Sequence, residues 1–531
     1  MKYMFSKLPQ TLSAQATLQQ EGWRNNFRND TSLIGPRPNS WWTGKPPIVG
    51  VCPGVNAKGI IRSLKLPNLQ TCTRQEASDY FDNIWTATEV LFSALQGEEA
   101  FFRPPYHQIR HSLIFYYCHP AVFYINKFKL AGIITESIDT AFEKLFEVGV
   151  DEMSWDDLSK NEGLWPAVHE VTAYRAKVYQ LVKKIISEHD EFNHLPITSH
   201  SALWSLFMGF EHERIHFETS SVLMRELPIH LVQKPKQWPE YYPPVISKHE
   251  PQPSIDYPVN AWLEVSLATV KQGKPENWPS FGWDNEYGEL TSEVKSFFAS
   301  QFLISNGEFW EFVISGGYQQ QHYWSDEGWN WCCFRNTTYP TFWIPTTENS
   351  TKDFKLRICF AIIPMQWSWP VIVNFHEVKA YCAWRSEKDK MTIPYRVMTE
   401  KEHCCLRDTV PYDPIMALTG EEMLAQKINI NMAFGSESPV NFSTPSQSGF
   451  YDVFGNVWEW CEDYFAPLPG FKAHYLYSDF SMPCFDNEHN IIMGGSFIST
   501  GDEASCWARY SFRRHFFQHA GFRLVHPKEK T

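Results

Sequence analysis

The chain has 531 residues and a formal net charge of −13, with 47 Lys and Arg against 60 Asp and Glu. Hydrophobic residues make up 43% and charged residues 20%, which predicts a folded protein of about two to four domains and excludes a disordered chain. The acidic balance argues against broad binding to nucleic acid or to an anionic membrane, because both need clustered Lys and Arg. Phe, Tyr and Trp form 16% of the chain, which favours loop-rich structure or aromatic-lined pockets.

Residues 1–70 contain several proline and tryptophan pairs and predict an extended arm that packs on the rest of the protein. Residues 71–235 are expected to be a helical domain, because apolar side chains recur there with the period of a helix. The predicted helices cover residues 75–95, 121–130, 138–148, 168–187 and 201–225.

Residues 236–260 are rich in proline and predict a linker laid over a surface. From residue 261 to residue 527 short apolar runs alternate with Gly, Pro, Asn and Asp, and only residues 306–315 and 376–385 have a helical pattern. The fold class is therefore predicted as α+β with two domains.

Targeting and membrane segments are not expected from the sequence. Residues 1–10 lack the apolar stretch of a secretory signal, and the longest uncharged run, residues 358–375, is interrupted by Pro364 and Pro370. The 12 cysteines in 531 residues are too sparse for a disulfide scaffold, and the absence of a C-x-x-C pair argues against a zinc ribbon. We therefore expect free thiols and a cytoplasmic location.

The strongest chemical signal is residues 209–218, with the sequence GFEHERIHFE. His212 and His216 are four residues apart, so on a helix both imidazoles reach the same ion. The pairs 107/111 and 515/519 have the same spacing, but only the pair 212/216 stands in a long periodic helix. Exposed histidines among charged neighbours remain the alternative interpretation.

A third ligand has to come from another helix. Glu218 lies about 200° around the helix from His216 and cannot share its face. The upstream candidates are His107, His111, His119 and His169. We favour His119, which is expected to open a helix whose apolar positions bury it. Three such imidazoles suit Fe(II) or Zn(II), and the spacing does not choose between them.

The pattern His212-x-x-x-His216-x-Glu218 with His119 resembles the three-histidine iron site in the DinB-like helical domain of sulfoxide synthases, the enzymes of ovothiol and ergothioneine biosynthesis. The second half resembles the C-type-lectin-like domain of formylglycine-generating enzymes at residues 395–402, 455–460, 494–497 and 520–524. The chain also resembles the ovothiol branch of this family, the 5-histidylcysteine sulfoxide synthases, at residues 41–47, 80–83, 149–157, 209–216 and 281–288. This resemblance covers roughly residues 35–527.

The resemblance implies an Fe(II)- and O2-dependent coupling of cysteine to C5 of histidine, with His119, His212 and His216 as iron ligands. A tyrosine near the iron donates a proton or a hydrogen bond in this family, and Tyr464 is the candidate here, although a structural tyrosine is an equal alternative. The substrate carboxylates would suit Arg, so we expect Arg509, Arg513 and Arg514 to contact them, unless each forms an ordinary ion pair.

The ovothiol enzymes usually carry a C-terminal methyltransferase, whereas this chain stops at Thr531. We therefore expect no S-adenosylmethionine activity here, and a separate methyltransferase and C–S lyase as partners in the pathway. Three alternatives stay open: a synthase acting on trimethylhistidine as in the ergothioneine branch, a selenium donor in place of sulfur, and a non-catalytic lectin-like binding module.

Overall fold

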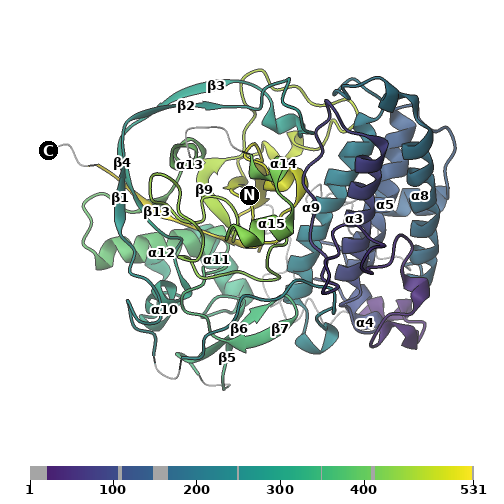
Figure 1. Ribbon diagram of the computed structural model, residues 1–531. Helices are drawn as coiled ribbons and strands as arrows, with labels where there is room; N and C mark the ends of the chain where they lie inside the picture. The colour runs from purple at the N-terminus through teal and green to yellow at the C-terminus, as the bar shows by residue number, and fades with distance from the viewer. Residues whose placement is uncertain are drawn as a thin grey trace.

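The computed structural model describes residues 21–105, 110–147, 165–247, 250–347, 350–407 and 413–528. Figure 1 shows a bundle of long helices beside a second half that mixes short strands, helices and loops. The two halves share one apolar core, which runs from Leu33 in the arm to Leu524 near the end of the described chain. The protein is therefore a mixed helix and sheet structure, and the DinB-like character of the helical half remains a prediction.

The helical half is built from four long and two short helices among the described residues: α3 (Arg74–Phe92), α4 (Glu98–Phe102), α5 (Leu113–Leu130), α6 (Thr140–Glu147), α8 (Val168–Glu188) and α9 (Trp204–Glu226). α3 begins at a capping box, in which Thr73 accepts from the backbone N–H of Glu76 and the Glu76 carboxylate accepts from that of Thr73. Four of the predicted helices are confirmed, with their ends shifted by a few residues.

The fifth, α5, begins eight residues earlier than predicted. It runs through Pro120, so His119 lies in the middle of the helix and does not open it. A proline inside a helix costs about 3 kcal/mol because one backbone hydrogen bond is lost. Every residue from Leu113 to Ile125 is buried, and each large apolar side chain buried there contributes about 1.5–3 kcal/mol. Tertiary packing therefore outweighs the local signal on which the prediction depended.

The described part of the arm contacts both halves. The indole N–H of Trp41 donates to the carbonyl of Glu89 in α3, over 3.0 Å. The backbone N–H of Leu66 donates to the carbonyl of Ile415, in the second half, over 2.8 Å. The proline-rich segment also lies on the second half, where the indole of Trp238 is buried and donates to the carbonyl of Gly435.

The strands of the second half are β1 (Trp262–Val265), β2 (Ala268–Gln272), β3 (Leu290–Val294), β4 (Phe297–Ser300), β5 (Trp343–Pro345), β6 (Phe354–Ile358), β7 (Ala361–Pro364), β8 (Arg396–Val397), β9 (Trp458–Tyr464), β10 (His489–Met493), β11 (Tyr510–Arg513), β12 (Ala520–Gly521) and β13 (Leu524–Pro527). They form two four-stranded sheets, in the orders β1-β4-β13-β8 and β11-β10-β9-β12, with the hairpin β2-β3 and the sheet β5-β6-β7. β12 pairs with β9 in parallel, and the other ladders are antiparallel.

The helices of this half are α10 (Asn306–Ile314), α11 (Asp326–Arg335), α12 (Phe375–Lys388), α13 (Glu400–Leu406), α14 (Pro414–Ala417) and α15 (Gly420–Ala425). The helices predicted at residues 306–315 and 376–385 are confirmed as α10 and α12. α13, α14 and α15 have at most seven residues, too few for a helical period to emerge in the sequence. α11 has ten residues, but only three of them are buried, so no apolar stripe marks it. In the described chain no helix has the combination of length and apolarity that crossing a membrane requires.

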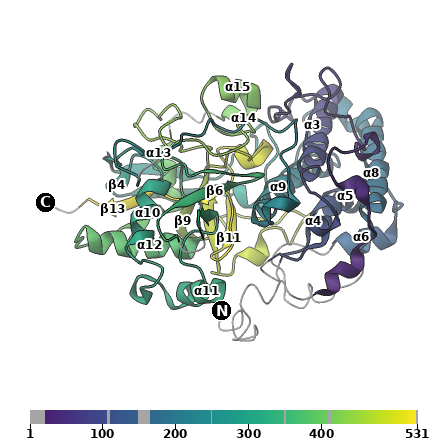
Figure 2. The same cartoon turned by 90° about the horizontal axis from the view of Figure 1, so that it is seen from below.

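One helix joins the two halves. In Figure 1, and again from below in Figure 2, α9 lies between the other long helices and the second half. Its neighbours are α5 and α3 on one side and residues 501–504 of the second half on the other. The histidine motif of the sequence lies on this helix, so the two halves meet at the candidate site.

Candidate metal centre

α9 is buried along almost its whole length. Of its 23 residues, only Ile215 and Glu226 are not fully buried. The helix ends where Leu227 takes an extended conformation in front of Pro228, as the residue before a proline prefers. α9 therefore contacts the helical half on one face and the second half on the other, and the polar residues on these two faces differ.

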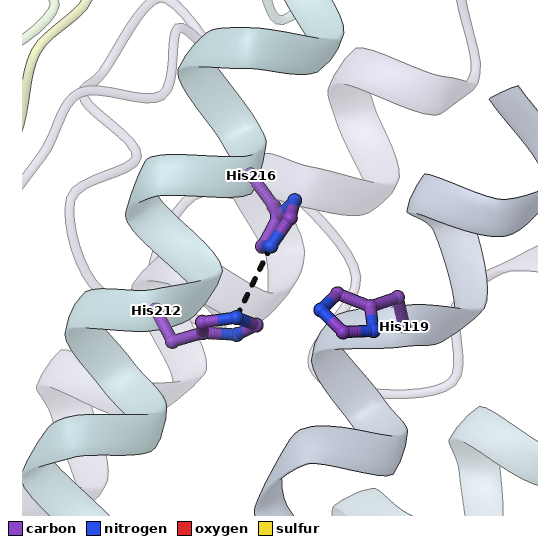
Figure 3. A group of neighbouring side chains, drawn as sticks. All are labelled: His119, His212 and His216. Carbon is purple, nitrogen blue, oxygen red and sulfur yellow. Dashed lines mark hydrogen bonds between the residues drawn. The ribbon is translucent and has the colours of Figure 1, made fainter. Parts of the chain in front are cut away.

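The face toward α5 carries His212 and His216, and α5 places His119 opposite them (Figure 3). The Nε2 atoms of His212 and His216 are 3.1 Å apart. The ring centre of His119 lies 5.0 Å from that of His212 and 4.6 Å from that of His216. One ring nitrogen from each residue lies within 4.8 Å of the other two, so the three can meet at a single ion.

A backbone carbonyl fixes the orientation of the His119 ring. Nδ1 of His119 lies 2.6 Å from the carbonyl oxygen of Phe146. Because a carbonyl only accepts, Nδ1 carries the proton and donates it, which leaves the lone pair on Nε2. Within the described residues this buried Nε2 has no hydrogen-bond partner. A histidine that ligates a metal commonly has this arrangement, in which the second ring nitrogen donates to a carbonyl.

Aromatic rings surround the three imidazoles. The ring of Phe123 is stacked on His212, with ring centres 3.5 Å apart and planes inclined by 7°. The ring of Phe115 is stacked on His119 at 4.8 Å. His119 and Phe123 are four residues apart on one face of α5, so the sequence spacing could have predicted that Phe123 lies near the other histidines.

The surroundings keep all three imidazoles neutral. Burial is the main cause that lowers the pKa of His119 to about 4, although its hydrogen bond to Phe146 acts in the opposite direction. Burial also lowers the pKa of His212 and of His216 well below the ordinary value, and the neighbouring histidines lower both further. Neutral imidazole is the form that binds a metal, so no proton has to leave before binding.

The donor set fits a divalent ion. With metal–nitrogen bonds of about 2.0–2.1 Å, two nitrogens at right angles around one ion are separated by about 3.0 Å. The separation of 3.1 Å between His212 and His216 agrees with this spacing. Three imidazoles suit Fe(II) or Zn(II) and leave positions for substrate.

The opposite face of α9 binds the second half. Glu218 is buried and accepts hydrogen bonds from the indole N–H of Trp458 at 2.8 Å and from the hydroxyls of Ser496 at 2.7 Å and Ser499 at 2.6 Å. The carboxylate thus points away from the histidines, as the helical geometry predicts. On the same side Ser221 and His519 share a hydrogen bond of 2.8 Å.

The other upstream histidines are not part of the group where they can be located. His111 is buried and its ring is stacked on Phe115, one ring removed from His119. His169 is exposed near the start of α8. His107 lies outside the described residues.

The predicted tyrosine does not lie with the histidines. Tyr464, at the end of β9, is 48% exposed, and the guanidinium of Arg514 lies over its ring at 4.9 Å. Two other tyrosines are next to the group among the described residues. The ring centre of Tyr116 is 5.8 Å from that of His216, and that of Tyr477 is 6.2 Å from that of His212. Tyr477 comes from an irregular segment 265 residues away along the chain from His212, and no sequence spacing could have indicated this contact.

The three predicted arginines each pair with a carboxylate in the second half. Arg509 binds Glu400 at 2.5 Å, Arg513 binds Glu488 at 2.5 Å, and Arg514 binds Glu327 at 2.9 Å. No contact that the structure describes joins them to the histidines, so their role toward substrate carboxylates remains a prediction.

Residues 264–528 match the family described as Sulfatase-modifying factor enzyme 1-like domain. Over 514 residues the chain is 22% identical to Ergothioneine biosynthesis protein 1 of Neurospora crassa, an alignment that covers 82% of this chain and 55% of that protein. Over 493 residues it is 22% identical to Ergothioneine biosynthesis protein 1 of Schizosaccharomyces pombe, covering 87% of this chain and 56% of that protein.

A shorter match is to Hercynine oxygenase of Mycobacterium tuberculosis, which is 28% identical over 216 residues, 40% of this chain and 48% of that protein. The chain spans about half the length of the curated relatives it matches. The second half is therefore a sulfatase-modifying-factor-like domain, and the chain is homologous to proteins named for ergothioneine biosynthesis.

Proposed function

We propose that the protein is a non-heme Fe(II)-dependent sulfoxide synthase that couples cysteine to C5 of histidine with O2 and gives 5-histidylcysteine sulfoxide. The observation that carries the proposal is the buried group of three neutral histidines at the junction of the two halves. The similarity to Hercynine oxygenase and to Ergothioneine biosynthesis protein 1 supports an oxidoreductase of this general kind.

The reaction balances with these reactants alone. The cysteine S–H and the ring C–H of histidine each lose their hydrogen, and a carbon–sulfur bond forms between the two. One oxygen atom of O2 becomes the sulfoxide oxygen, and the other leaves as water with the two hydrogens. O2 is thereby reduced by four electrons, which the two substrates supply.

The protein's own residues supply position and a dry environment. His119, His212 and His216 would hold the metal, and an Fe(II) ion bound there supplies the redox chemistry with O2 and a site for a thiolate. Phe115 and Phe123 cover two of the three imidazoles and exclude water from them. The ring carbon of histidine has to lie close to the cysteine sulfur, so catalysis depends mainly on how the pocket orients the two amino acids.

Tyr477 is the tyrosine that we assign to the proton or hydrogen bond donated near the iron. Its ring lies beside His212, whereas Tyr464 is half exposed and in contact with Arg514. Tyr477 is itself 8% exposed, so a proton on its hydroxyl is sheltered from bulk water.

The main alternative is a synthase that uses trimethylhistidine. The names of the relatives favour it, because they refer to hercynine and to ergothioneine. The resemblance to the ovothiol branch at residues 41–47 and 281–288 favours unmodified histidine. The two substrates differ only at the amino group, so a few pocket residues decide between them.

The experiment loads the purified protein with Fe(II) without oxygen and then admits O2 with cysteine and either histidine or trimethylhistidine. We expect O2 consumption and equal loss of cysteine and histidine, with a product that mass spectrometry identifies as the sulfoxide. Faster turnover of trimethylhistidine would establish the alternative. Turnover that persists after iron is removed by a chelator would contradict both, and an iron-free protein that binds amino acids without turnover would indicate a binding module.

A further inference from the structure

A small cavity lies between α9 and the segment 516–518 of the second half. Its volume is about 20 Å³, and its walls include Arg110, Thr219, Glu226 and Gln518, with the ring of Phe516. The cavity therefore has contributions from the helical half and from the second half, like the histidine group itself.

The cavity lies beside the face of α9 that carries the histidines, between that face and the second half. Arg110 is close to this face as well. At about 100° and about 1.5 Å per residue, Thr219 lies about 60° around the helix and about 4.5 Å along it from His216, and Glu226 lies about 80° around and about 15 Å along. Thr219 is therefore the wall residue of α9 that lies nearest to His216, and the candidate metal centre is on the Thr219 side of the cavity.

Gln518 brings a buried donor to the cavity. Its side chain is 2% exposed, and its Nε2 has no hydrogen-bond partner within the described part of the chain. An unsatisfied buried donor costs free energy, so a group in the cavity that accepts from Gln518 would be stabilised. The neighbouring residue His519 is tied to Ser221 of α9, which fixes the backbone that carries Gln518.

The cavity also carries both signs of charge. Arg110 is 8% exposed and its guanidinium lies over the ring of Phe516 at 4.5 Å, while Glu226 supplies a carboxylate. An α-amino acid has a carboxylate and an ammonium group on one carbon, so its head group is complementary to this pair. Neither a simple anion nor a simple cation would use both charges.

We infer that this cavity binds the head group of an α-amino acid, with the carboxylate on Arg110 and the Gln518 amide and the ammonium on Glu226. The inference rests on the proposed function, because it takes that amino acid to be histidine or cysteine. It assigns substrate binding to residues that line this cavity, and not to Arg509, Arg513 and Arg514.

Glu226 also marks the route from solvent. It borders a second cavity of about 30 Å³ and an open groove of about 600 Å³ at the C-terminal end of α9. Glu226 lines the first cavity, the second cavity and the groove together, so this side chain lies between the proposed binding site and the open surface. Arg225, Arg335 and Arg357 line the groove, and they attract the carboxylate end of an incoming amino acid.

The test is anaerobic titration calorimetry on Fe(II)-loaded protein with two matched sets of probes. The first set is histidine, histamine and imidazolepropionic acid, and the second is cysteine, cysteamine and 3-mercaptopropionic acid. Each set contains the amino acid, its analogue without the carboxylate and its analogue without the amine. The set that responds to the variants identifies which of the two amino acids occupies the cavity.

We expect Arg110→Met to weaken binding of the amino acid and of the analogue without the amine about tenfold or more. Binding of the analogue without the carboxylate should change by less than twofold. Gln518→Leu should act on the same two probes with a smaller loss. Glu226→Gln should weaken binding of the amino acid and of the analogue without the carboxylate, and should leave binding of the analogue without the amine unchanged. Arg385→Met and Glu188→Gln, both far from the cavity on α12 and α8, serve as matched controls, and iron content has to be unchanged in every variant.

Equal losses for all three probes, or no loss, would overturn the inference even if the wild-type protein turns over histidine and cysteine. Selective losses in a protein that shows no O2-dependent turnover would support the inference and contradict the proposed function. A wild-type protein that binds no member of either set would overturn the inference as well.

Discussion

The indole N–H of Trp458 donates a hydrogen bond to the carboxylate of Glu218 over 2.8 Å, across 240 residues of sequence. Ser496 and Ser499 donate to the same carboxylate, so three donors of the second half meet one buried acid on α9. Glu218 stands two residues after His216, on the opposite face of the helix. The contact that joins the two halves therefore also fixes the position of a candidate metal ligand.

Replacing Glu218 by alanine should destabilise the protein strongly. The change removes the shared acceptor of three buried donors, and hydrogen bonds to a charged group contribute about 1.5–3 kcal/mol each with incomplete additivity. We expect the free energy of unfolding to fall by roughly 3–5 kcal/mol in urea denaturation, and less for Glu218→Gln. Glu188→Ala, at an exposed end of α8, is the control and should change it by less than about 0.5 kcal/mol. A Glu218→Ala protein as stable as the control would show that the contact does not hold the halves together.

Local spacing predicted much of the helical half and part of the site. The i+4 pair His212 and His216 is a property of one helix, and so is the exclusion of Glu218 from their face. The start of α5 was missed because burial of residues 113–125 outweighs Pro120. Tyr477, Ser496 and Ser499 come from irregular segments and Trp458 from the start of β9, all far away in the sequence from α9. No periodic pattern in the sequence predicts which of these segments contacts the helix.

Gly209 should be intolerant of alanine. A Cβ at this position would overlap the ring of Tyr124, which is fully buried where α5 packs against α9. Alanine stabilises an ordinary helix by about 1 kcal/mol relative to glycine, but overpacking in a core costs about 1–3 kcal/mol. We expect a net loss in unfolding free energy and weaker iron binding, because His212 follows three residues later. Gly22→Ala meets no atom within 4 Å and is the control. A stabilised Gly209→Ala protein would contradict this packing.

His212→Ala should remove the metal and His111→Ala should not. His212 belongs to the group of three nitrogens, whereas the ring of His111 is stacked on Phe115 and lies outside that group. Elemental analysis after Fe(II) loading should give about one iron per chain for the wild type and for His111→Ala, and far less for His212→Ala. A ligand that binds only the folded state raises its stability, so added Fe(II) should raise the melting temperature of the first two proteins alone. Equal iron content in all three would reject the proposed ligand set.

Tyr477→Phe and Tyr464→Phe separate the two candidate tyrosines. Tyr477 lies beside His212, and Tyr464 lies half exposed against Arg514. Removing a positioned proton donor typically costs a factor of about 100 or more in rate. We expect Tyr477→Phe to lower the rate of O2-dependent coupling at least tenfold with iron content unchanged, and Tyr464→Phe to stay within twofold. The opposite result would return the role to Tyr464.

Glu377 should make stability depend on pH. This carboxyl group is buried at the start of α12, where it accepts from the hydroxyl of Tyr318 and from the backbone N–H of Asn374. Burial raises the pKa of Glu377 to about 7 from an ordinary value of 4.5, although both hydrogen bonds oppose the shift. Between these two values the folded protein binds more protons than the unfolded chain does. The free energy of unfolding therefore falls as pH rises through this window.

Glu377→Gln removes the titration and keeps the shape of the side chain. The stability of the variant relative to wild type should rise from pH 5 to pH 8 by on the order of 2–3 kcal/mol, with a slope of at most about 1.4 kcal/mol per pH unit. Urea denaturation at five or six pH values measures the difference between variant and wild type, in which the contributions of the titrating groups that both share cancel. Glu188→Gln is the matched control. A difference that does not change with pH would show that Glu377 is ionised throughout the range, held so by Tyr318 and Asn374.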